Sequence, residues 1–233
     1  MAKKNVEKMP KKEKVSATDK LGNFLVKYRV VFLSVICVVV AGLAGYTAYL
    51  NVNAKNVEKG LTQVEKIEYI LTKDSAALSE SELEAKYVAA LSALEPLTAK
   101  GGIIGARALY LKAEIKFNLK DCAAALDAYL AAAKKVKKSY LSSICYYCAG
   151  VCCEELNDTD KALEYYENAA NDPNFCDTTH ALFNVARLKE VKQDFAGAKA
   201  EYEKITAKNN PNDPWANAAH SRILQMQIDG KTE

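Results

Sequence analysis

The pattern of hydrophobic and polar positions begins with a long apolar run near the N-terminus. From Val30 to Leu50, 21 consecutive residues carry no charged side chain. A helix rises about 1.5 Å per residue, so a helix of this length crosses the roughly 30 Å hydrocarbon layer of a membrane. Tyr28 precedes the run, and Tyr46 and Tyr49 lie near its end, where aromatic side chains suit the headgroup region. The sequence therefore predicts a transmembrane helix over residues 30–50.

The helical pattern continues beyond the apolar run. Residues 51–71 keep apolar side chains close to helical spacing, with Gly60 as the weakest point and a candidate for a bend. The stretch LTKDSAALSESELE then interrupts the pattern. A second helix is predicted from Ser81 to Lys100, with Pro96 placed where that helix frays or kinks. We therefore expect residues 51–100 to form a long linking helix and an N-terminal helical hairpin.

A short sequence pattern repeats three times in the C-terminal half of the chain. The copies ALDAY, ALEYY and AKAEY each run from an alanine to a tyrosine, and their first residues are 37 and 36 positions apart. A small residue lies twelve positions before each of those alanines. The repeated residues are Ala113, Ala125 and Tyr129, then Gly150, Ala162 and Tyr166, then Ala186, Ala198 and Tyr202. A period of roughly 20–50 residues is typical of stacked supersecondary units, here helical hairpins that approach at the small residues and are filled by the tyrosines.

This order of small and aromatic residues resembles the tetratricopeptide repeat (TPR). The second unit resembles it most, through Tyr146, Ala149, Gly150, Ala162, Tyr166 and Ala169. The chain departs from the pattern at Cys153, Lys116 and Lys189, where the first helix of the repeat carries an aromatic residue. The resemblance implies an all-α fold, in which the transmembrane helix is followed by an α-solenoid of helical hairpins.

Three TPR-like hairpins are expected over residues 101–210. Residues 211–233 are expected to form a capping helix and a tail. Asp213 is the predicted N-cap of that helix and Pro214 lies in its first turn.

Composition and charge give the orientation of the predicted span. The chain is rich in Ala, Leu, Lys, Glu and Tyr and poor in Gly and Pro, which favours helix. Its net charge of +3 conceals an asymmetry, since residues 1–29 carry nine Lys or Arg and three acidic residues, and the remainder is negative. This basic flank predicts a cytoplasmic N-terminus. We expect residues 1–29 to be a mostly disordered basic tail, with an interfacial helix from Lys20 onward.

The same charge asymmetry limits the partners that we expect for the chain. Because the basic residues are concentrated in the tail, we expect anionic lipid at the tail and no nucleic acid.

The alternative to a transmembrane helix is a cleaved signal peptide with Ala44 as its last residue. The apolar run exceeds the roughly 7–15 residues of a signal-peptide core, which favours the uncleaved span.

No catalytic motif stands out in the sequence. It contains no Walker-type glycine loop, no HExxH and no GxSxG, and its two histidines, His180 and His220, are expected on different helices. We therefore expect no enzyme activity, cofactor, metal site or small-molecule substrate.

The cysteines are the remaining candidates for chemistry. Six lie outside the apolar run, at Cys122, Cys145, Cys148, Cys152, Cys153 and Cys176. Cys145 and Cys148 have the spacing of a dithiol redox motif, and Ser142 as a helix N-cap would lower the pKa of Cys145. However, no βαβ pattern surrounds them, and Cys145, Cys148 and Cys152 follow the spacing of one buried helix face. We favour a packed apolar stripe, followed by a structural disulfide; zinc binding or thiol oxidoreductase activity through Cys145 and Cys148 is a minor alternative.

The TPR resemblance implies a protein-binding groove lined by the first helix of each hairpin. Carried onto this sequence, the groove positions are Arg107, Tyr110, Glu114, Tyr147, Val151, Glu154, Phe183, Asn184, Arg187, Glu190, Asn217 and His220. This mixture of aromatic residues and both charge signs suits extended or unfolded polypeptide.

The layout of nearly the whole chain is similar to that of the YfgM-like family, ancillary subunits of the SecYEG translocon. The shared features are a basic tail, one N-terminal span and TPR hairpins after a long helix. The resemblance implies a single-pass protein of the bacterial inner membrane, with its C-terminal domain in the periplasm. Its implied partners are translocon subunits, a periplasmic chaperone and unfolded secreted chains. A scaffold for cell-envelope assembly or division is the alternative, because one fold serves many functions.

Overall fold

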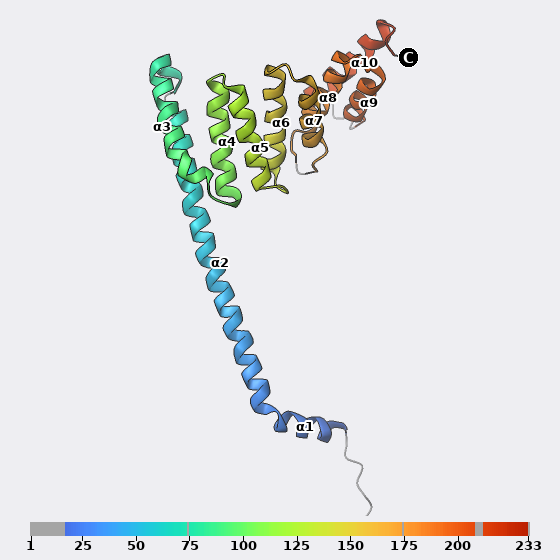
Figure 1. The fold of residues 1–233 in the computed structure, drawn as a ribbon. Coiled ribbons are helices and arrows are strands. Elements are labelled where there is room, and N and C mark those ends of the chain that lie inside the picture. Colours follow the sequence, from blue (N-terminus) through green and yellow to red (C-terminus); the bar gives the residue numbers. More distant parts are fainter. Residues whose placement is uncertain (1–16, 74, 174, 208–211, 233) are drawn as a thin grey trace, which may run out of the picture. The chain divides into compact units, whose positions relative to one another are not determined.

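The computed structural model describes residues 17–73, 75–173, 175–207 and 212–232, and every regular element in these ranges is helical (Figure 1). The predicted all-α fold is thus confirmed. The chain divides into two compact units, residues 1–55 and residues 56–233. Each is described by itself.

The first unit contains helix α1 (Ala17–Lys27) and the N-terminal part of helix α2 (Arg29–Thr72). Helix α1 begins at Ala17, slightly before Lys20, the residue at which the sequence predicts the start of an interfacial helix. Residues 1–16 of the predicted tail lie outside the described residues. Among the described residues, α2 is the one helix long and apolar enough to cross a membrane, and none of its most apolar window is buried. A membrane span and a signal sequence both fit this helix.

Polar side chains within the apolar run bond to their own helix. The Ser34 hydroxyl donates to the Val31 carbonyl at 2.8 Å, and the Thr47 hydroxyl donates to the Ala44 carbonyl at 2.9 Å. A hydroxyl that is satisfied by its own backbone is compatible with a lipid environment.

The second unit begins with the C-terminal part of α2, which packs against α3 (Glu80–Thr98) and α4 (Gly102–Asn118). Helix α2 runs through Gly60 without ending there. A Cβ atom at Gly60 would lie 2.5 Å from Cδ1 of Ile104, so the glycine permits a close approach between α2 and α4. Val64 of α2, Leu94 of α3 and Leu111 of α4 belong to the core that these helices share.

The helix predicted over residues 81–100 is α3, which follows a short 3-10 turn, η1 (Ser75–Ala77). Its N-cap is Ser79, and Glu82 completes a capping box by accepting from the Ser79 backbone N–H. Pro96 lies inside the last turn of α3 and does not end it earlier.

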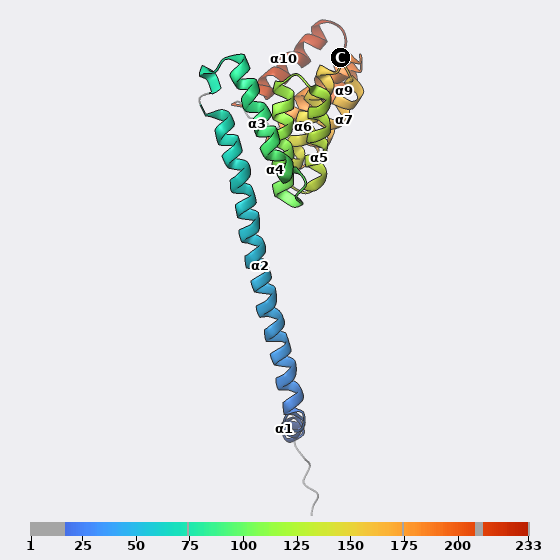
Figure 2. The ribbon, with the colours of Figure 1, turned by 60° about the vertical axis from the view of Figure 1, so that its left-hand side comes forward.

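Three helical hairpins follow one another along the second unit (Figures 1 and 2). They are α4 with α5 (Cys122–Lys135), α6 (Tyr140–Glu155) with α7 (Thr159–Ala170), and α8 (Thr178–Val191) with α9 (Phe195–Thr206). The second helix of each hairpin also packs on the first helix of the next, and α9 packs on α10 (Pro214–Ile228). This sequential packing is consistent with TPR architecture, as the repeat predicts. The predicted cap of α10 is also confirmed, since Asp213 accepts from the backbone N–H of Trp215 and Pro214 is the first helical residue.

The turn inside each hairpin uses one residue in the left-handed region. These residues are Lys120, Asn157 and Gln193, with φ of 63°, 60° and 63°. The aspartate that follows each of them caps the second helix, accepting a hydrogen bond from the backbone N–H three residues further on. These are the turn-like polar stretches of the repeat.

The small and aromatic residues of the repeat form the core between the helices. Gly150 of α6 is buried, and a Cβ atom there would lie 2.8 Å from ring atoms of Tyr166 on α7. Tyr166 is itself buried and belongs to one core cluster with Val185 and Leu188 of α8. The predicted close approach and the predicted filling of the gap to the next hairpin are therefore both confirmed.

Candidate protein-binding groove

The predicted groove residues lie on α4, α6, α8 and α10, the first helices of successive units. Arg107, Tyr110 and Glu114 come from α4, Tyr147, Val151 and Glu154 from α6, Phe183, Asn184, Arg187 and Glu190 from α8, and Asn217 and His220 from α10. Asn184 is buried, Asn217 and His220 are exposed, and the others are half-buried. We call this row of first-helix side chains the groove.

An aromatic pair recurs between the two helices of each hairpin. The ring centroids of Tyr110 and Tyr129 are 5.6 Å apart, those of Tyr147 and Tyr166 are 5.2 Å apart, and those of Phe183 and Tyr202 are 5.3 Å apart. In every pair the first ring comes from a groove position and the second is the repeated tyrosine of the next helix. Tilted and edge-on rings at these distances attract one another, so each groove aromatic is held by its own hairpin.

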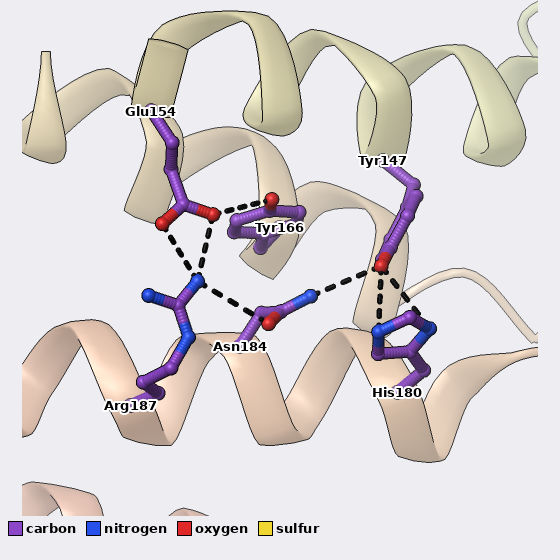
Figure 3. Close-up of polar contacts among 6 residues, drawn as sticks. All are labelled: Tyr147, Glu154, Tyr166, His180, Asn184 and Arg187. Atoms are coloured by element: carbon purple, nitrogen blue, oxygen red, sulfur yellow. Dashed lines mark hydrogen bonds and ion pairs between the residues drawn. The ribbon is translucent and has the colours of Figure 1, made fainter. Parts of the chain in front are cut away.

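Glu154 joins the second hairpin to the third (Figure 3). Its carboxylate accepts a hydrogen bond of 2.7 Å from the Tyr166 hydroxyl, within its own hairpin. It also accepts from the Arg187 guanidinium of α8 at 2.6 and 2.7 Å. Two predicted groove residues of opposite charge are thus paired with each other and anchored by a buried tyrosine.

The same arrangement recurs one hairpin further on. Glu190 of α8 accepts from the Tyr202 hydroxyl at 2.7 Å and is paired with Arg222 of α10. The Glu190 side chain is only 9% exposed, so its negative charge needs this partner. Glutamate, tyrosine and arginine therefore form a repeated three-residue link between neighbouring units.

Tyr147 is the centre of the other half of the network in Figure 3, which Asn184 joins to Arg187. Its hydroxyl accepts from Nδ2 of Asn184 at 3.1 Å and lies 2.8 Å from Nε2 of His180. The His180 ring stacks on Trp215 of α10 with a centroid distance of 3.8 Å, and its Nδ1 lies 3.1 Å from Asp177. Burial raises the pKa of Tyr147 to about 12, so its hydroxyl stays protonated at neutral pH.

The N-terminal end of the groove differs from the rest. Arg107 turns to α2, where it is paired with Glu65 at 3.0 Å and Glu68 at 3.4 Å. Glu114 lies near the Tyr110 hydroxyl, which partly offsets the effect of burial on its pKa, and no Lys or Arg side chain within the described residues forms an ion pair with it. Burial raises the pKa of Glu114, and the nearby charge of Glu68 adds to the shift. This carboxylate is thus desolvated without a compensating cation.

The structure brings some of the predicted groove residues together and leaves others apart. Tyr147, Glu154, Asn184 and Arg187 form one connected network, whereas Asn217 and His220 lie exposed on α10. Sequence reasoning missed the supporting residues Tyr166, Trp215 and Arg222 as parts of this surface. The link between glutamate and arginine could have been found from their spacing, which is 33 residues for Glu154 and Arg187 and 32 for Glu190 and Arg222, close to the period of the repeat.

The cysteines behave as packing residues. All seven are free, and Cys145, Cys152 and Cys153 are fully buried. The cap of α6 is Ser139, not Ser142 as predicted, which moves Cys145 into the interior of the helix. Burial raises the pKa of Cys145 above its ordinary value and that of Cys148 to about 11, so neither is an activated thiol. The lowered Cys145 pKa on which the redox alternative rested is therefore wrong, and the burial of Cys145 and Cys152, with Cys148 packed against them, agrees with the favoured apolar stripe.

Within the described ranges, no group of three or more His, Cys, Asp and Glu residues is arranged to hold a metal ion. His180 is used in the cluster with Tyr147 and Trp215, and His220 is exposed on another helix.

Comparison with known proteins agrees with this architecture. No family model matches the chain. The chain is similar to a TPR protein. A TPR repeat-containing protein of Treponema pallidum (strain Nichols) is 31% identical over 153 residues, a match that covers 64% of this chain and 64% of the relative. The chain therefore spans somewhat less than two thirds of the length of that relative.

Proposed function

We propose that this protein is a membrane-anchored protein–protein interaction module whose groove binds polypeptide. The observation that carries the proposal is the row of half-buried aromatic and charged side chains on α4, α6 and α8, fixed by the aromatic pairs and by the links at Glu154 and Glu190. Side chains that are ordered before binding lose less conformational entropy when a partner arrives. Such a surface is suited to polypeptide recognition.

The proposed action is binding without catalysis. The buried thiols have raised pKa values, which opposes nucleophilic chemistry at Cys145 and Cys148. TPR arrays are generally interaction modules, and the similarity to a TPR repeat-containing protein supports the same role here.

We further propose that the protein is an ancillary component of the translocon and its chaperone network. In this proposal α2 spans the bacterial inner membrane once, the basic tail is cytoplasmic and the hairpins lie in the periplasm. The support consists of the apolar run in α2, the positive charge of residues 1–29 and the resemblance in layout to YfgM-like proteins. The partners would be translocon subunits, a periplasmic chaperone and unfolded secreted chains.

The partners can be identified by photocrosslinking in cells. A photoreactive residue would replace Val151 or His220 on the first helices, and Glu164 of α7 or Glu203 of α9 as controls on the second helices. We expect groove positions to capture translocon subunits together with many unrelated secreted chains. Capture of one stable envelope protein would favour the alternative of an assembly or division scaffold. Equal capture from both sets of positions would contradict the groove assignment.

A further inference from the structure

Two adjoining cavities lie at the N-terminal end of the groove, where the C-terminal part of α2 and helix α3 meet α4. The larger has a volume of about 560 Å³ and is walled by α2, α3, α4 and α5. The smaller has a volume of about 230 Å³ and extends towards α6. They share Glu68, Leu111 and Glu114, so they adjoin along α2 and α4, and we refer to the two together as the cleft.

The walls of the larger cavity combine apolar and aromatic surface. Tyr87 of α3, Leu111 and Phe117 of α4 and Tyr129 of α5 line it. The charged residues that line the two cavities are Glu68, Glu114 and Arg107, and Arg107 already has Glu65 and Glu68 as partners. The cleft therefore carries an excess of negative charge against aromatic walls.

Glu114 is the uncompensated member of this set. The other glutamates on the repeat helices that are half-buried or buried have cations beside them: Glu154 has Arg187, Glu190 has Arg222, Glu201 has Lys189 at 2.9 Å, and Glu167 has the same lysine at 3.8 Å. Among the described residues Glu114 has no such cation, and it lines both cavities of the cleft. The links at Glu154 and Glu190 show how this chain satisfies such a carboxylate, which is with an arginine from the neighbouring element.

We propose that this cleft binds an arginine side chain of a partner polypeptide. The guanidinium would pair with Glu114 and lie near Glu68, while the aliphatic stem would run along Leu111 and Phe117. Arginine suits the cleft better than lysine, because its planar group can bridge carboxylates and stack on the half-buried ring of Tyr87. The inference rests on the proposed function and specifies which side chain anchors the polypeptide.

Binding of matched peptides tests this inference. The probes are SALXALSG-amide peptides that carry fluorescein on the N-terminal amine and in which X is arginine, lysine or citrulline, titrated against the full chain in detergent. Citrulline keeps the shape of arginine and lacks its charge. We expect the arginine peptide to bind about tenfold more tightly than the citrulline peptide, with lysine between them.

The variant Glu114→Gln removes the charge and keeps an oxygen that can accept from Tyr110. We expect it to abolish the preference for arginine over citrulline, whereas the control Glu203→Gln, on exposed surface of α9, keeps it. If Glu114→Gln fails to fold, Glu68→Gln is expected to reduce the preference by a smaller factor, and the wild-type comparison of arginine with citrulline needs no variant.

The proposal is overturned if arginine and citrulline peptides bind alike, if neither binds, or if Glu114→Gln keeps the preference. Its failure differs from failure of the proposed function. Capture of polypeptides from Val151 alongside equal arginine and citrulline affinities would leave a protein-binding groove with a different anchor.

Discussion

Glu154 of α6 and Arg187 of α8 form an ion pair of 2.6 Å between two successive hairpins, and the Tyr166 hydroxyl holds the same carboxylate. The pair is half-buried, with side-chain exposures of 28% and 39%. Surface pairs contribute about 0–1 kcal/mol, and removal of one partner of a fully buried pair costs about 3–5 kcal/mol. We therefore expect the loss of stability on removing one partner of this half-buried pair to lie between these two ranges.

Removing the arginine from this link should loosen the array. We expect Arg187→Met to lower the free energy of unfolding by about 1–2 kcal/mol, because the Glu154 charge is left without its cation. A double-mutant cycle with Glu154→Gln, measured by urea unfolding, should show a coupling energy of about 1 kcal/mol that shrinks in 1 M salt. Strictly additive single-variant effects would show that the pair contributes nothing to stability.

Gly150 is expected to tolerate no side chain. Gly150→Ala places a Cβ atom 2.8 Å from the Tyr166 ring, which is buried on all sides. Overpacking costs about 1–3 kcal/mol, and the better helix propensity of alanine returns at most about 1 kcal/mol. Thermal unfolding should therefore show a net loss of stability. Ala113 and Ala186 occupy the equivalent positions of the other two hairpins, which already accommodate an alanine there. A Gly150→Ala variant as stable as wild type would contradict the close approach of Gly150 to Tyr166.

The hairpin turns offer stabilising substitutions. Lys120 and Gln193 have positive φ, which costs a non-glycine residue free energy that glycine avoids. Lys120→Gly and Gln193→Gly should each raise the free energy of unfolding by roughly 0.5–1 kcal/mol. Asn157→Gly should gain less, because asparagine tolerates this conformation. Chemical denaturation of the three variants gives the comparison, and a loss of stability at Lys120 or Gln193 would exclude the left-handed turn.

The stability cost of Glu114 should depend on pH in a defined direction. Because burial raises its pKa above the ordinary value of about 4.5, the folded chain favours the protonated form. Stability from this group is present below the unfolded pKa and is lost as the pH rises through the folded pKa. Glu114→Gln should therefore match wild type near pH 4 and exceed it at pH 7, by less than about 1 kcal/mol. The reverse order would mean that Glu114 has a cationic partner in the folded chain.

Thiol labelling tests the packing of the cysteines and the proposed topology together. Cys176 is exposed, whereas Cys145, Cys152 and Cys153 are buried. A membrane-impermeant maleimide added to cells with a permeabilised outer membrane should modify Cys176, and Cys176→Ser should remove most of that signal. The buried thiols should react only after unfolding, because burial opposes both access and ionisation. Labelling of Cys176 only after the inner membrane is broken would place the hairpins in the cytoplasm.

The fold followed from local sequence features. The spacing of Gly150, Ala162 and Tyr166 repeats because each hairpin needs a small residue at the helix contact and a large one at the next gap. The polar turn and the cap at Asp213 are likewise determined by neighbouring residues. Such features can be recognised without knowing the three-dimensional arrangement.

The site was harder to predict because its contacts join different hairpins. The groove positions follow from the resemblance to the TPR, but the pairing of Glu154 with Arg187 depends on side chains 33 residues apart. Glu68, at one end of the groove, comes from α2, outside the repeat altogether. The error at Cys145 has a simpler cause: placing the cap at Ser142 instead of Ser139 shifts the start of α6 by three residues.

The most direct test of the groove is site-resolved crosslinking with purified full chain and a permanently unfolded polypeptide, such as reduced and carboxymethylated lactalbumin. A photoreactive residue would be placed at Val151 on the first helix of the second hairpin, or at Glu164 on its second helix. We expect the yield of adduct at Val151 to exceed that at Glu164 by at least about tenfold. Equal yields, or adducts formed only at Glu164, would contradict the claim that the first helices bind polypeptide.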